Sequence, residues 1–152
     1  MITTLPPEPV AYRADDIQLG FAPMDKVHAE FIAAVDALVV APDEAVAPSL
    51  AALERHTREH FEAEERWMNE TAFPARECHA DEHAAVLRSV VGVGARVARG
   101  DLAAARTLGA ALREWFPGHA DYMDAALAHW MCKLRHGGKP VVLRRPQVAA
   151  AA

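Results

Sequence analysis

The chain has 152 residues, and 52% of them are hydrophobic, which is enough for a single domain with a full apolar core. Its 16 Lys and Arg residues against 21 Asp and Glu residues give a formal net charge of −5, which excludes the basic surface typical of a nucleic-acid-binding protein. No segment approaches the roughly 20 apolar residues of a membrane span, and residues 1–24 contain no apolar run typical of a signal peptide, so we expect a cytoplasmic protein with no membrane or nucleic-acid partner.

Helical periodicity extends nearly throughout from Asp25 to Pro140 and predicts four helices, the last of which should end at about Arg135. Asp25 is expected to be the N-cap of the first helix. Pro42 and Pro48 are expected to bracket the connection to the second helix, which should end at Phe73-Pro74. The first two helices are thus defined mainly by their prolines and by one capping carboxylate.

The third helix is expected to end at Gly100, a residue suited to the C′ position, and Asp101 is expected to cap the fourth helix. Helices joined by short connections pack most simply as antiparallel neighbours. The predicted fold class is therefore all-α, an up-down-up-down antiparallel four-helix bundle. The predicted organisation is an N-terminal arm, the bundle and a C-terminal tail, at 1–24, 25–136 and 137–152.

Five histidines and two carboxylates are spaced so that helices could direct all of them inward: His28, His60, Glu64, His79, His83, His119 and Asp124. Residues four apart on a helix share a face, so His60 pairs with Glu64, and His79 pairs with His83. Buried imidazoles and carboxylates need partners, and these two groups are the ligand set of non-haem iron. The alternative is a bundle with hydrogen-bonded core histidines and no metal, which would need a separate partner for each polar group.

His119 and Asp124 are five residues apart, about 140° around an ideal helix, so they cannot share a face without a distortion. Pro117 and Gly118 come directly before them. Because proline lacks a backbone donor and clashes with the preceding turn, we expect a kink or a local bulge in this part of the fourth helix.

The sequence contains Met24-Asp25-Lys26-Val27-His28, His60-Phe61-Glu62-Ala63-Glu64-Glu65, His79 and His83 after Phe73-Pro74, and Trp115 through His119 to Asp124. Together these segments resemble the hemerythrins, in particular the single-domain bacterial hemerythrins. The resemblance implies a four-helix bundle around a non-haem di-iron centre that binds O2 reversibly.

In the family pattern, His79, His83 and His119 would hold one iron, and His28 and His60 would hold the other. Glu64 and Asp124 would bridge the two irons together with an oxo or hydroxo group. Of the about twelve coordination positions of two octahedral irons, this ligand set leaves one free, on the iron with two histidines.

The expected role is storage, delivery or transport of O2 by a protein that is not an enzyme and is a monomer, with no protein partner indicated by the sequence. Two alternatives stay open. One is a sensor module that responds to O2, NO or redox state, and the other is a di-iron protein that consumes peroxide or NO.

Residues beside the candidate ligands are expected to have lesser roles. His56 and Glu65 should be polar or outer neighbours of the site, and Cys78 should be a small buried side chain. Cys78 and Cys132 are too few for a disulfide framework and are expected to be reduced. Three aromatic residues are expected to line the cavity that admits O2: Phe31, Phe61 and Trp115.

Overall fold

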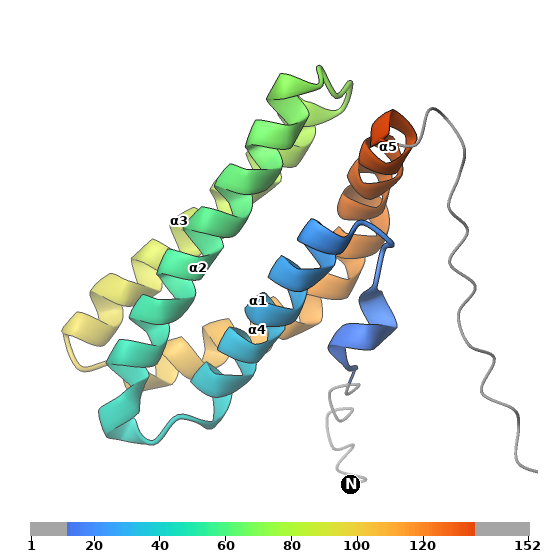
Figure 1. Cartoon of the computed structure of the whole chain (residues 1–152). Helices are drawn as coiled ribbons and strands as arrows, with labels where there is room; N and C mark the ends of the chain where they lie inside the picture. Colours follow the sequence, from blue (N-terminus) through green and yellow to red (C-terminus); the bar gives the residue numbers. More distant parts are fainter. Residues whose placement is uncertain (1–11, 136–152) are drawn as a thin grey trace, which may run out of the picture.

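The computed structural model describes residues 12–135, which form helices and no strand (Figure 1). A short 3-10 helix, η1, precedes the long helices. The bounds of the helical elements are η1 Ala14–Ile17, α1 Ala22–Val40, α2 Asp43–Glu70, α3 Arg76–Ala98, α4 Leu102–His119, η2 Ala120–Asp124 and α5 Ala125–Arg135. Among the described residues, no helix has the length and apolar character needed to cross a bilayer.

The long helices form the predicted antiparallel bundle. α1 packs against α2 and α4, and α3 packs against the same two helices from the other side. α4, η2 and α5 continue one another without leaving right-handed helical geometry, so they form a single fourth rod in Figure 1. The all-α four-helix prediction is therefore confirmed.

Two predicted boundaries of the third and fourth helices agree with the structure. Gly100 follows α3 with a φ of 92°, a left-handed conformation that glycine adopts without steric cost. The Asp101 side chain accepts a 3.2 Å hydrogen bond from the Ala104 amide at the start of α4. This interaction satisfies one of the amides that a helix N-terminus leaves without an internal partner.

The predicted N-cap of the first helix and the predicted start of the second helix are wrong. α1 begins at Ala22, and Asp25 lies within its first turn, where its carboxylate accepts hydrogen bonds from the amides of Leu19 and Gly20. α2 begins at Asp43, so Pro48 lies inside the helix rather than in a connection. Burial of the Val46 side chain, which is fully inaccessible, fixes this first part of α2 against the core and offsets the missing proline donor.

The described part of the N-terminal segment packs on the bundle. Tyr12 is packed against the apolar core, and Ile17 and Phe21 are buried, with 8% and 2% of their surface exposed. The described part of the predicted N-terminal arm therefore contacts the bundle. Residues 1–11 of the predicted arm, and the predicted tail 137–152, lie outside the described residues.

The apolar core consists of two clusters, one nearer each end of the bundle. Along α2, Leu53 belongs to the first cluster and Met68 to the second. Along the fourth rod, Phe116 belongs to the first cluster and Leu127 to the second. The candidate ligands of both rods lie between these residues in the sequence, so they form a buried polar layer between two apolar clusters.

A π-helical segment, η2, interrupts the fourth rod from Ala120, two residues after Gly118. Its hydrogen bonds join residues five apart, as in the one from the Ala125 amide to the Ala120 carbonyl. The wider turn brings positions five apart toward the same face. The predicted bulge is therefore confirmed. It begins directly after His119 and ends at Asp124.

Candidate metal centre

The structure brings all seven candidate side chains together in the polar layer. They come from α1, α2, α3 and the fourth rod, and each has at most 3% of its surface exposed. They form two overlapping groups that could each hold a cation. The three-histidine group contains His79, His83 and His119, the two-histidine group contains His28 and His60, and Glu64 and Asp124 belong to both.

Glu64 divides its two carboxylate oxygens between the histidine groups. Oε1 lies 3.3 Å from Nε2 of His28 and 2.8 Å from Nε2 of His60. Oε2 lies 3.3 Å from Nε2 of His79 and 3.1 Å from Nε2 of His83. Each oxygen therefore faces one group.

Asp124 divides its oxygens in the same way. Oδ2 lies 3.1 Å from Nε2 of His28, whereas Oδ1 lies 2.9 Å from Nε2 of His79 and 3.1 Å from Nε2 of His119. In both carboxylates, one oxygen faces the two-histidine group and the other faces the three-histidine group. This arrangement is expected of ligands that bridge two cations. The π turn makes this possible, because it places Asp124 beside His119.

Several buried atoms of this layer have no hydrogen-bond partner among the described residues. They include Nε2 of His79, His83 and His119, and both carboxylate oxygens of Asp124. These nitrogens approach the carboxylate oxygens closely without hydrogen-bond geometry, so atoms that can bind a metal converge on common points. Buried polar atoms without partners are costly, and a cation at these points would satisfy them. The residues present therefore fit a metal ion.

The buried charges of this layer need compensation. Burial lowers the pKa of His28 and of His79, but the adjacent carboxylates of Asp124 and Glu64 outweigh it and raise each pKa to about 9. Burial raises the pKa of Glu64 and of Asp124, but the surrounding histidines outweigh it and lower each pKa below its usual value. The layer therefore holds two buried negative charges, which either protons or a metal must compensate.

Aromatic rings surround the layer. Phe61 stacks on His83 at 3.9 Å between ring centroids, and Phe31 meets the His60 ring edge-on at 5.6 Å. Phe116, which the sequence did not indicate, meets the His28 ring at 4.9 Å. Phe31 and Phe116 are 1% and 0% exposed, so buried apolar rings flank the two-histidine group.

One outer neighbour was missed by sequence reasoning. Glu82 Oε1 lies 3.0 Å from Nδ1 of His119 and 2.9 Å from the indole nitrogen of Trp115. The available signal was its place on α3 three residues after His79, which is close to the same helix face.

Predictions for the other neighbours had mixed outcomes. Glu65 lies 3.6 Å from Nδ1 of His83, and His56 contacts the Val27 carbonyl at 3.2 Å, so both are outer neighbours as expected. The prediction that Cys78 is buried is wrong, because its side chain is exposed. Position 78 lies on the outer side of α3, one residue before the buried His79.

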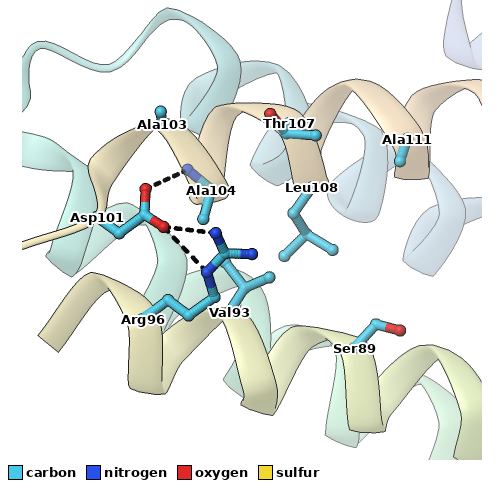
Figure 2. A pocket seen from close by; sticks show the side chains of 9 residues that line it. All are labelled: Ser89, Val93, Arg96, Asp101, Ala103, Ala104, Thr107, Leu108 and Ala111. Atoms are coloured by element: carbon cyan, nitrogen blue, oxygen red, sulfur yellow. Dashed lines mark hydrogen bonds and ion pairs between the residues drawn. The ribbon is translucent and has the colours of Figure 1, made fainter. Parts of the chain in front are cut away.

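A pocket of about 440 Å³ lies elsewhere, between α3 and the start of α4 (Figure 2). Its charged residues, Arg96 and Asp101, are paired with each other at 2.7 Å. None of the seven candidate ligands lines it. This pocket is therefore separate from the buried layer and offers no comparable set of unpartnered atoms among the described residues.

Comparison with known proteins gives a consistent result. The family model of the hemerythrin HHE cation-binding domain matches residues 13–130. A bacteriohemerythrin of Ralstonia nicotianae is 36% identical over 125 residues, which cover 82% of this chain and 91% of that protein. No solved structure matches the chain. The matched residues include all seven side chains of the buried layer, and the chain belongs to the hemerythrin HHE cation-binding family.

Proposed function

We propose that this protein binds O2 reversibly at a non-haem di-iron centre and serves in oxygen storage, delivery or transport. One observation carries the proposal. Glu64 and Asp124 each direct one carboxylate oxygen toward the two-histidine group and the other oxygen toward the three-histidine group. Two iron ions in these groups would supply the two electrons that reversible binding of O2 requires. The related bacteriohemerythrin supports the same assignment.

In this proposal each protein group has a definite task. His79, His83 and His119 would hold one iron, His28 and His60 would hold the other, and both carboxylates would serve both ions. The two-histidine group has fewer protein ligands, so a diatomic molecule would bind on that side.

The apolar surroundings support a carrier over an enzyme. Phe31 and Phe116 cover the imidazoles of the two-histidine group and keep bulk water and proton donors from them. Exclusion of water protects a reactive bound ligand from proton-dependent side reactions. We therefore propose a binding protein that is not an enzyme.

The proposal includes a cytoplasmic location and a monomeric state. The net charge of −5 favours repulsion between copies. Light scattering coupled to size-exclusion chromatography tests the monomer, for which a single mass of 16.5 kDa is expected.

The test of the main function is an optical spectrum of metal-analysed protein. The protein is reduced without O2, then exposed to O2, and finally freed of O2 again. Two irons per chain and a visible absorption band that appears with O2 and disappears on its removal would support the proposal. Iron that oxidises at once, with no recoverable reduced form, would contradict reversible binding.

A sensor role is the second candidate, and one observation favours it. Tyr12 of the N-terminal segment contacts Arg113 on the fourth rod, six residues before His119. A shift of the fourth rod on ligand binding would therefore reach this segment. Limited proteolysis near residue 12, faster or slower with O2 than without it, would favour the sensor, whereas equal cleavage rates would favour the carrier.

A further inference from the structure

We propose that Glu82 is a positioning residue for the metal centre. It fixes His119 in the form that binds metal and makes the three-histidine group the tighter of the two metal positions. Because this concerns the same buried layer, the inference rests on the proposed function.

The contact between Glu82 and His119 determines which ring nitrogen carries the proton. An ionised carboxylate can only accept hydrogen bonds, so Nδ1 of His119, 3.0 Å from Glu82 Oε1, must donate. The proton on Nδ1 leaves a lone pair on Nε2, which lies 3.1 Å from Asp124 Oδ1 within the candidate metal group. Glu82 thus selects the tautomer that a metal ligand needs.

Trp115 holds this arrangement from a second side. Its indole nitrogen donates to the same Glu82 oxygen at 2.9 Å, and its ring stacks on His119 at 4.5 Å between centroids. The carboxylate is therefore held by two donors, and the imidazole is fixed both at its edge and on its face. Neither the carboxylate nor the ring can turn without breaking one of these contacts.

The acidic outer neighbours lie on one side of the centre. Glu65 is 3.6 Å from Nδ1 of His83, another member of the three-histidine group, which is close but beyond hydrogen-bond distance. Among residues 12–135, Nδ1 has no hydrogen-bond partner in His28, His60, His79 or His83, so His119 is the one candidate ligand of these residues whose outer nitrogen has such a partner. A carboxylate on the outer nitrogen raises the basicity of an imidazole, so it strengthens the bond of the inner nitrogen to a metal. The two metal positions should therefore differ in affinity for a reason additional to their number of histidines.

The experiment is a titration of the metal-free full chain with Co²⁺, followed by optical absorption and by competition with a chelator. Wild type is expected to bind two ions with distinct dissociation constants. E82L removes both the acceptor and the charge, and it should raise the first dissociation constant roughly 10- to 100-fold while the second stays at its wild-type value. E82Q keeps a carbonyl oxygen that can accept both hydrogen bonds, so its first constant should fall between those of wild type and E82L.

The matched control is E54Q on α2. The Glu54 side chain is 31% exposed, close to the 30% of Glu82, but it pairs with Arg58 and contacts no histidine of the layer. E54Q should bind both ions as wild type does. W115F, which keeps an aromatic ring but removes the indole donor, provides a second test if E82L does not fold, and it should also weaken the first site.

Nitrogen NMR of the metal-free protein gives a readout that does not depend on metal. The His119 resonances should indicate a proton on Nδ1 in wild type and in E82Q, and a mixture of tautomers in E82L. A wild type that binds no Co²⁺ would overturn the proposed metal centre and this inference with it. A wild type that binds two ions, together with an E82L that matches E54Q or weakens both sites equally, would overturn this inference alone.

Discussion

The hydroxyl group of Tyr12 donates a 2.9 Å hydrogen bond to the backbone carbonyl of Arg113, 101 residues away in the sequence. In an α-helix that carbonyl would accept from the amide four residues later, but position 117 is a proline and has no N–H. Arg113 returns the contact, because its guanidinium donates to the Tyr12 carbonyl at 2.7 Å and lies over the Tyr12 ring. The N-terminal segment therefore supplies the donor that Pro117 removes.

This relationship predicts the effect of Y12F. The variant keeps the aromatic ring under Arg113 but leaves the Arg113 carbonyl without its donor. Its free energy of unfolding should therefore be about 1 kcal/mol lower than that of wild type. Denaturant unfolding measures the change. The control is Y122F, because Tyr122 is 86% exposed and its replacement should leave the free energy of unfolding unchanged. Equal losses in both variants would contradict the role of the Tyr12 hydroxyl.

A second prediction concerns two glycines of α4. A Cβ added at Gly118 would meet nothing within 4 Å, so G118A should stabilise the protein by about 0.5–1 kcal/mol through the helix preference of alanine. A Cβ added at Gly109 would lie 2.8 Å from Val39 Cγ2, so G109A should lose this gain or destabilise the bundle. Thermal unfolding of the two variants gives the comparison, and a G118A less stable than wild type would show that the Pro117-Gly118 pair needs its glycine.

The bridging role of Glu64 can be tested by E64Q. The amide keeps the shape of the side chain but removes the charge that faces both histidine groups, so metal binding should weaken more than the roughly 100-fold typical of losing an outer partner. Metal content after dialysis and a Co²⁺ titration measure the effect. E62Q is the matched control, since Glu62 lies two residues earlier on α2 and is exposed. Full metal content in E64Q would rule out the bridge.

The pH dependence of stability should differ between metal-free and metal-loaded protein. The folded state raises the pKa of His28 and of His79 from 6.5 to about 9, so protonation stabilises the metal-free fold. This stabilisation is fully present below pH 6.5 and is lost as pH rises through about 9. Metal requires deprotonated imidazoles, so its contribution grows over the same range.

Thermal unfolding of both forms between pH 6 and pH 9.5 provides the measurement. The gap between the two Tm values should widen as pH rises across this range. A gap that narrows would mean that protons do not occupy His28 and His79 when metal is absent.

Much of the fold and the candidate site could be predicted from sequence because both depend on local spacing. His60 with Glu64, and His79 with His83, share helix faces through periodicity alone, and the structure places both pairs in the buried layer. The bulge near Pro117 followed from the same rule, applied to a spacing that an ideal helix cannot accommodate.

The features that sequence missed depend on contacts between distant segments. Pro48 was placed outside the second helix because local chemistry favours a break, whereas burial of Val46 fixes that turn in the core. The place of Glu82 three residues after His79 puts it near the ligand face of α3, but periodicity within α3 cannot indicate its partner, His119, which lies on another helix 37 residues away. The docking of Tyr12 on Arg113 is of the same kind.

The π segment also constrains how the length of this rod can change. Each residue of an α-helix turns the chain by about 100°, and deletion of one residue between His119 and Asp124 would leave them four apart, a spacing that shares one face of an ordinary α-helix. Such a deletion would remove the π turn while the later residues kept their faces. Insertion of one residue there would instead turn everything after it by about 100°, so Asp124 would leave the histidines, and Leu127, Ala128 and Met131, all buried in the second apolar cluster, would turn toward solvent. The rod should therefore tolerate the loss of one residue at this point but not the gain of one, whereas substitutions at the exposed Asp121 and Tyr122 would leave the register intact.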